Sequence, residues 1–277
     1  MRGKDLREML IRGERVFGIG IEGYGQPRWP RFLAQYALDF VFMDNEHTPL
    51  NRETMAWAAQ AYAAYGITPL LRIPEPSPGL AAMAADLGAH GIVAPYVESV
   101  EQVKARVGAV KYRPLKGEAL RRALDHHVFP GSDVPSYLEA YNQDALVMIM
   151  IESPAGLRNL PAMLAFGGVD AVLIGPHDLS ISLGVPESYE HPLFEQMASE
   201  IIQVARAHNV GAGIHFTAGD MARARRWLDW GCNLIVHRTD TLFVAGGIHN
   251  ELGALRQVYD DVSAQTLNTA TASGHAI

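Results

Sequence analysis

The sequence contains a single cysteine, Cys232, among 277 residues. One thiol excludes an intrachain disulfide framework and is typical of proteins from a reducing compartment. Long apolar runs are also lacking, since none approaches the ~18 uninterrupted apolar residues that a membrane span needs. The amino-terminal stretch MRGKDLREMLIRGERV is charged and has no apolar centre like that of a secretory signal. We therefore expect a cytoplasmic protein with no membrane association.

Positive charge is scarce as well. There are 23 Lys and Arg residues against 30 Asp and Glu, which gives a formal net charge of −7. No dense stripe of lysine and arginine is present, so the sequence argues against a nucleic-acid partner. What the chain does have is apolar content, 48% of its residues, which is enough for one large core.

Short apolar runs alternate with helix-like segments along the whole chain. Runs of this kind, bounded by Gly and Pro, are typical of strands buried on both faces of a parallel sheet. Eight such alternations favour a single (β/α)₈ TIM barrel over residues 1–263, followed by a small, polar and disordered tail at 264–277. The predicted strands are Val16–Glu22, Phe40–Asp44, Ile67–Ile73, Gly91–Tyr96, one closing on Glu152, one closing before Asp178, Gly211–Phe216 and Asn233–His237.

Two carboxylates close neighbouring strands. Glu152 ends the run ALVMIMIES, and Asp178 follows the run VDAVLIGPHD. Because a βαβ unit brings both to the same end of the sheet, they can supply oxygen ligands to Mg²⁺ or a similar divalent ion, with open positions for water and substrate. The alternative is structural: Glu152 would form a strand-end ion pair and Asp178 would cap the next helix.

Other charged groups fall at the same predicted end of the barrel. Asp44, Glu46 and His47 close the second strand, and Arg72 closes the third. A metal on Glu152 and Asp178 could chelate a 2-oxo acid, while Arg72 stabilises the enolate oxygen. His47, oriented by Asp44, could move protons. The alternatives are a loop histidine that caps a helix and, for Arg72, a barrel-end ion pair with Glu46 or Glu75.

The segment after the sixth strand predicts a carboxylate site. Backbone amides around Gly175, His177 and Asp178 stand where a loop begins a helix, an arrangement that binds anions. We expect them to take the carboxylate of a small 2-oxo acid substrate, with an aldehyde as the second reactant.

Four motifs carry a resemblance. DFVFMDNEHTPL, PLLRIP, MIMIES and VLIGPHDLSISLG resemble the HpcH/HpaI aldolase/citrate lyase family, in particular class II pyruvate aldolases of the 2,4-dihydroxyhept-2-enedioate aldolase type. The resemblance runs from about Val16 to the last helix. A strand-end D-x-E-H together with GPxDLSxSLG is specific, whereas either alone would be weak.

The resemblance implies a (β/α)₈ barrel that forms a homo-oligomer, a hexamer or trimer, with a C-terminal helix exchanged between subunits. It implies Mg²⁺, Mn²⁺ or Co²⁺ on Glu152 and Asp178, enolate stabilisation by Arg72, and a base dyad of His47 with Asp44. The implied reaction is reversible cleavage of a 4-hydroxy-2-oxo acid to pyruvate and an aldehyde.

The chain departs from the family pattern near the site. Met150 stands where members carry a glutamine, and His177 where they carry a small residue. His215 and His237 end the seventh and eighth strands, where less basic residues are expected. YRPLKGEAL replaces the family's YPPxGxRG segment.

The stretch Lys111–Asp144 is long for a connection between a strand and a helix. We expect it to pass over the barrel mouth and to select acidic aldehydes through basic side chains. The alternative is a solvated face or a subunit boundary. The first part of this stretch, Lys111–His127, contains the basic residues Lys111, Arg113, Lys116, Arg121 and Arg122, and it also contains His126.

Two other functions remain open at this point. A lyase acting on a CoA thioester would use the same basic stretch to meet phosphates. A catalytically silent barrel that binds a small acid as a sensor would need neither His47 nor Asp44 beside its metal.

Overall fold

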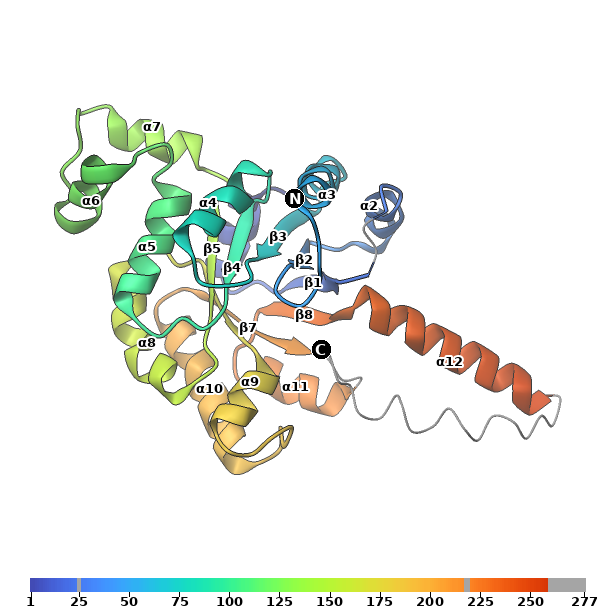
Figure 1. Ribbon diagram of the computed structural model, residues 1–277. Coiled ribbons are helices and arrows are strands. Elements are labelled where there is room, and N and C mark those ends of the chain that lie inside the picture. Colours follow the sequence, from blue (N-terminus) through green and yellow to red (C-terminus); the bar gives the residue numbers. More distant parts are fainter. Residues whose placement is uncertain (24–25, 217–219, 259–277) are drawn as a thin grey trace.

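The computed structural model describes residues 1–23, 26–216 and 220–258, and eight parallel strands form a closed barrel in it. Each strand pairs with the next in sequence, and β8 pairs with β1, so the predicted (β/α)₈ fold is confirmed (Figure 1). The strands are β1 Val16–Ile21, β2 Phe40–Asp44, β3 Thr68–Arg72, β4 Gly91–Ala94, β5 Leu146–Met150, β6 Ala171–Ile174, β7 Gly211–Phe216 and β8 Leu234–Thr239.

Helices surround the barrel and connect its strands. They are α1 Gly3–Ile11, α2 Trp29–Leu33, the short 3₁₀ helix η1 Ala34–Tyr36, α3 Arg52–Ala64, α4 Pro78–Asp86, α5 Val100–Lys111, α6 Gly117–His126, α7 Val134–Tyr141, α8 Pro154–Phe166, α9 Pro176–Ser182, α10 Pro192–Ala207, α11 Met221–Asp229 and α12 Asp240–Val258.

The apolar runs form strands because both of their faces are covered. Every residue of β2 to β6 is buried. One set of side chains, including Phe40 and Leu146, fills the barrel, and the alternate set, including Val41 and Val147, packs under the helices. This two-sided burial is typical of a parallel sheet.

Helix α1 closes the amino-terminal end of the barrel. Its Leu6 and Leu10 are fully buried and join the interior cluster with Phe40 and Leu146. Burying a leucine side chain contributes about 1.5–3 kcal/mol, so the two hold α1 firmly in place. The opposite end, where the strands finish, is therefore the open end of the barrel.

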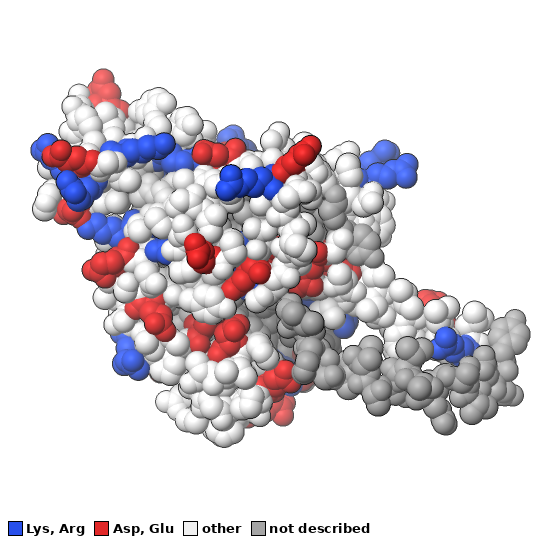
Figure 2. All heavy atoms as spheres, in the orientation of Figure 1, with Lys and Arg blue, Asp and Glu red and all other residues white. Residues whose placement is uncertain are grey.

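The segment between α5 and β5 lies at the closed end, so the prediction that it covers the mouth was wrong. Helix α5 continues to Lys111 and runs back to the amino-terminal end before the segment begins. Asp144, just before β5, pairs with Arg2, and Lys111 bonds to Asp170 at the start of β6. Figure 1 shows α6 and α7 beside α5, and Figure 2 shows basic and acidic side chains mixed over this corner of the molecule.

Helix α12 leaves the barrel after β8 and projects away from it (Figure 1). Several of its apolar side chains are exposed, among them Phe243, Ile248, Leu252 and Leu255. The predicted boundary at residue 263 and the predicted disordered tail, 264–277, lie outside the described residues. Within the described part of the chain, no helix is both long and apolar enough to cross a membrane.

Candidate active site

The ends of β2 and β3 place Asp44 and Arg72 beside each other. The two residues are partners in the strand register. Arg72 donates from Nε to Asp44 Oδ1 at 2.9 Å and from Nη2 to Oδ2 at 2.6 Å. Burial by itself would raise the pKa of Asp44, but the hydrogen bonds and charge of Arg72 hold that pKa below its usual range. The pair is therefore ionised and fixed.

Glu46 extends this pair toward the mouth. Its Oε2 lies 3.1 Å from Nη1 of Arg72, so the predicted structural alternative for Arg72, an ion pair with Glu46, is present. Arg72 has five N–H donors and uses three of them on Asp44 and Glu46. Within the described part of the chain, its other two N–H groups make no hydrogen bond.

His47 stands at the rim with an exposed side chain. Its contact with Asp44 is through the backbone, where the His47 N–H lies 3.4 Å from Asp44 Oδ1. Among residues 1–23, 26–216 and 220–258, the imidazole ring makes no hydrogen bond to Asp44. The structure therefore brings the two residues together but commits the Asp44 carboxylate to Arg72 and to backbone amides.

Glu152 and Asp178 lie on neighbouring strand–helix turns. Ser153 begins α8 as its cap, and its Oγ accepts from Gly156 N at 3.1 Å, so the chain turns directly after Glu152. The backbone carbonyl of Glu152 accepts from Ser182 Oγ at 2.8 Å, which ties α9 to this turn. Asp178 sits in the first turn of α9.

The Glu152 carboxylate is buried among other acids. Burial first, and then the nearby charges of Asp178 and Glu46, raise its pKa to about 7. The backbone N–H of Tyr96 donates to its Oε2 at 2.9 Å. A Cβ at position 175 would stand 2.4 Å from its Oε1, so Gly175 leaves the room that this carboxylate occupies.

These residues fit a divalent cation. Buried oxygen donors with like-charged neighbours are stabilised by a positive ion, and hard oxygen ligands suit Mg²⁺ or Mn²⁺. In the described part of the chain, no group of three or more His, Cys, Asp or Glu side chains could hold a metal. Glu152 and Asp178 line one cavity and could serve as ligands, with water and substrate completing the coordination.

A cavity of about 590 Å³ opens beside this carboxylate pair. It lies at the carboxyl ends of β4, β5 and β6, and the size suits a small-molecule substrate. Its walls include Tyr96, Glu98, Glu152, His177, Asp178 and Ser182.

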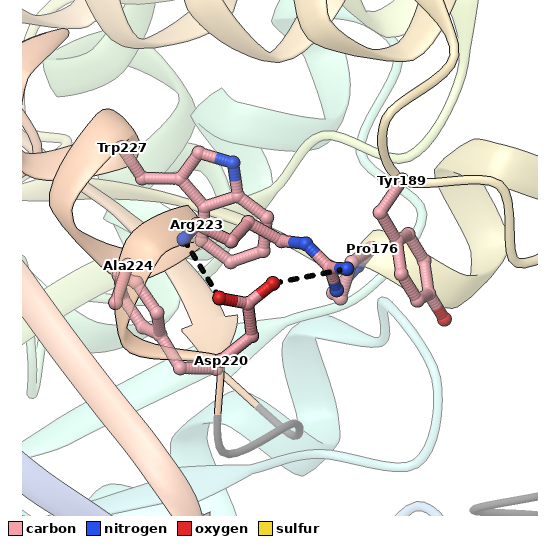
Figure 3. Close-up of a pocket in the computed structure, with 7 residues that line it drawn as sticks. Pro176, Tyr189, Asp220, Arg223, Ala224 and Trp227 are labelled. Carbon is pink, nitrogen blue, oxygen red and sulfur yellow. Dashed lines mark hydrogen bonds and ion pairs between the residues drawn. The ribbon is translucent and has the colours of Figure 1, made fainter.

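A second, much smaller cavity lies between α11 and the loop before α10 (Figure 3). Asp220 caps α11 by accepting from Arg223 N at 3.1 Å, and the Arg223 guanidinium lies over the Tyr189 ring. The volume is about 10 Å³, which suits one water molecule and excludes a substrate. This cavity is a packing feature.

The residues that depart from the family pattern fall into three settings. Met150 is buried in the barrel interior, where it forms an apolar floor under the site. His177 is exposed beside Glu187, 3.6 Å away. His215 lies inside the barrel next to Phe42, and burial, followed by the charge of Arg72, lowers its pKa to about 4, so the ring is neutral.

One residue of the site, Tyr96, has no role in the sequence interpretation. Its backbone N–H holds the Glu152 carboxylate. The one available signal in the sequence was its position at the end of the predicted fourth strand, after Pro95.

Comparison with known proteins points to one family. The model of HpcH/HpaI aldolase/citrate lyase matches residues 26–243. The chain is 31% identical to the 2-keto-3-deoxy-L-rhamnonate aldolase of Salmonella gallinarum over 267 residues, 96% of each chain. It is 30% identical to the enzyme of the same name from Klebsiella pneumoniae, over 89% of this chain and 91% of that one.

A solved structure repeats the fold. The HpcH/HpaI aldolase from Desulfitobacterium hafniense superposes with a TM-score of 0.78 at 24% identity, over 91% of this chain and 96% of that one. At 24% identity, this similarity shows a shared fold and nothing about function.

Proposed function

The chain belongs to the HpcH/HpaI aldolase/citrate lyase family, and on that premise we propose that it is a class II pyruvate aldolase. It is a carbon–carbon lyase that cleaves a 4-hydroxy-2-oxo acid to pyruvate and an aldehyde, reversibly. The curated relatives act on 2-keto-3-deoxy-L-rhamnonate by name, which is a substrate of this chemical type. The observation that carries the proposal is the pair Glu152 and Asp178 beside a cavity at the barrel mouth, with Arg72 fixed nearby.

The proposed metal site uses Glu152 and Asp178, which line the same cavity. A divalent cation such as Mg²⁺, Mn²⁺ or Co²⁺ held there would act as a Lewis acid on the keto group of the substrate. The Tyr96 N–H and the space left by Gly175 set the direction of the Glu152 carboxylate.

Arg72 is proposed to stabilise the negative charge that develops on the keto oxygen. Asp44 and Glu46 fix its guanidinium, and among the described residues its other two N–H donors have no hydrogen-bond partner. Donors held in position before the reaction lower the barrier without reorganisation. Asp44 contributes by holding Arg72.

His47 is proposed to carry protons at the rim. Its side chain is exposed next to the Asp44–Arg72 pair, and an imidazole exchanges protons near neutral pH. Replacing it with alanine is expected to slow cleavage more than the exchange of pyruvate methyl protons, and equal loss of both would make His47 the base for every proton step.

The carboxylate of the 2-oxo acid is proposed to bind at the turn of Gly175, His177 and Asp178. Gly175 has no side chain to block the approach to Glu152, and the N-terminus of α9 has no side-chain cap. The backbone amides there are therefore available to a substrate.

A second copy of the chain is proposed to cover α12. The helix projects from the barrel with an exposed apolar side that includes Ile248, Leu252 and Leu255. Exposed apolar surface of this extent favours association, and the family resemblance implies a trimer or hexamer. Light scattering after size exclusion tests this, since a monomeric mass would contradict it.

The CoA-thioester alternative has no support in the structure. Lys111, Arg113 and Lys116 lie at the closed end of the barrel, whereas the cavity lies at the open end. A panel of 4-hydroxy-2-oxo acids, assayed for pyruvate release with and without Mg²⁺, Mn²⁺ or Co²⁺, tests the proposed function. Metal-dependent release supports it. Cleavage of thioesters and not of free acids would favour the alternative.

A further inference from the structure

Tyr96 has an unusual backbone conformation at the edge of the cavity. It follows β4 and Pro95 and has a φ of +53°. This left-handed region is costly for an aromatic residue, and such strain is found mostly at functional sites. A glycine would adopt the same conformation freely. The presence of a tyrosine side chain at this position, where glycine would cost less, therefore needs an explanation.

The backbone of Tyr96 serves the proposed metal ligand. Its N–H donates to Glu152 Oε2 at 2.9 Å. Any amino acid at position 96 could provide this bond, so it does not account for the phenol.

The phenol reaches the other half of the site. The ring lines the 590 Å³ cavity with Glu152 and Asp178, and the residue is 46% exposed. Burial first, and then the nearby carboxylate of Glu46, which also pairs with Arg72, raise the pKa of the Tyr96 phenol, so the hydroxyl stays protonated. The oxygen of a protonated phenol has lone pairs that can accept a hydrogen bond from a bound molecule.

The cavity wall next to Tyr96 also carries a negative charge. Glu98 is an exposed residue of the wall, and its Oε1 accepts from Ser153 Oγ. A metal would compensate Glu152 and Asp178, and the single charge of Arg72 is shared between Asp44 and Glu46, so Glu98 adds to a net negative charge at the site. Such a wall repels an anionic aldehyde.

We propose that Tyr96 is a specificity-determining residue whose hydroxyl accepts a hydrogen bond from the aldehyde half of the substrate, so that the site takes uncharged, hydroxyl-bearing aldehydes in preference to anionic ones. The inference rests on the proposed function and names the class of its second substrate. It also replaces the expectation that the segment after α5 selects acidic aldehydes.

Three two-carbon aldehydes test the role of the phenol at equal size: acetaldehyde, glycolaldehyde and glyoxylate. The readout is the ratio of kcat/KM for glycolaldehyde to that for acetaldehyde in addition to pyruvate, because this ratio cancels any change in pyruvate enolisation. Tyr96→Phe keeps the backbone and the ring and removes only the hydroxyl. We expect the ratio to fall about fivefold to tenfold, the worth of one hydrogen bond. Tyr137→Phe, at an exposed tyrosine of α7, is the matched control and leaves the ratio unchanged.

Glu98→Gln tests the charge. It is expected to raise kcat/KM for glyoxylate relative to glycolaldehyde by about threefold, the scale of an exposed charge interaction. Glu101→Gln, an exposed carboxylate on the first turn of α5, is its control and should not change this ratio.

The outcomes separate this inference from the proposed function. An unchanged hydroxyl ratio in Tyr96→Phe, or an unaltered protein that prefers glyoxylate to glycolaldehyde, would overturn the inference. Exchange of pyruvate methyl protons with deuterium requires no aldehyde. If the unaltered protein with Mg²⁺ or Mn²⁺ shows no exchange, the proposed function fails and the inference fails with it.

Discussion

Asp44 and Arg72 are register partners at the ends of β2 and β3, and their side chains meet in a two-point ion pair. Arg72 is 8% exposed and Asp44 is 2% exposed, so water competes little for either. A planar guanidinium held by two parallel hydrogen bonds has one orientation. Arg72 is therefore aimed before any substrate arrives.

Asp44→Asn tests how far this pair supports the fold. The buried Arg72 keeps its ion pair with Glu46, so the free energy of unfolding should fall by about 2–3 kcal/mol, less than when a buried charge loses every partner. Burial opposes ionisation of Asp44, yet Arg72 lowers its pKa on balance. A lowered pKa stabilises the fold above the ordinary aspartate value of about 4 and loses this effect as the pH falls below it. Urea unfolding should therefore show a large difference between the two proteins at pH 7 and a smaller one at pH 3. An equal difference at both pH values would contradict the assignment.

Arg72→Lys tests the shape of the donor at constant charge. A lysine ammonium cannot pair with both Asp44 oxygens and still point two N–H groups at the keto oxygen. We expect turnover in cleavage to fall by about 10²–10³, as for the loss of an oxyanion donor. Steady-state kinetics with any cleaved 4-hydroxy-2-oxo acid measures the effect. Turnover within threefold of the unaltered protein would remove Arg72 from the proposed chemistry.

The raised pKa of Glu152, about 7, predicts how metal binding depends on pH. A raised pKa stabilises the metal-free fold fully below the ordinary glutamate value of about 4, and this effect is lost as the pH rises through about 7. A bound cation needs the ionised carboxylate, so metal affinity should rise between about pH 6 and pH 8. The increase in Tm on adding Mg²⁺ should grow over the same range. Glu152→Gln should show little increase at any pH, and a pH-independent increase in the unaltered protein would contradict the assignment.

Lys111 predicts a separation of stability from activity. Its Nζ lies 2.7 Å from Asp170 Oδ2, in a network that also includes Arg7. Lys111→Met should lower the free energy of unfolding by about 2 kcal/mol, because Arg7 still pairs with the buried carboxylate. Lys116→Ala, at an exposed lysine of the same segment, is the control and should have no effect. Thermal unfolding measures this. Neither variant should change the preference among aldehydes. If either variant changed that preference, the segment would contribute to substrate selection.

The strand ends explain why so much of this site could be predicted. Apolar runs closed by charged residues placed Asp44, Arg72 and Glu152 at one end of a parallel barrel, because all eight strands point the same way. That inference needs only the order of the elements and the alternation of strand and helix. The resemblance of the four motifs to the family added support for the metal ligands and for the role of Arg72 in stabilising the enolate.

The sequence alone could not predict the position of residues 112–145 or the contacts of Tyr96. The position of residues 112–145 depends on where α5 ends, and α5 continues to Lys111 because Val107 and Val110 still face the core. Tyr96 acquires its contacts from a positive φ that residue type does not predict for tyrosine. Its partners, Glu152 and Glu46, come from other strands and are visible only in three dimensions.

The central claim is that Glu152 and Asp178 hold a divalent cation that the cleavage requires. The most direct measurement is pyruvate release from a 4-hydroxy-2-oxo acid by protein treated with EDTA, before and after Mg²⁺ or Mn²⁺ is added back, beside Glu152→Ala and Asp178→Ala. We predict no release without metal and full recovery with it in the unaltered protein. We predict no recovery in either variant, although circular dichroism shows both folded. Full activity in the metal-free protein, or recovery in either variant, would contradict the account.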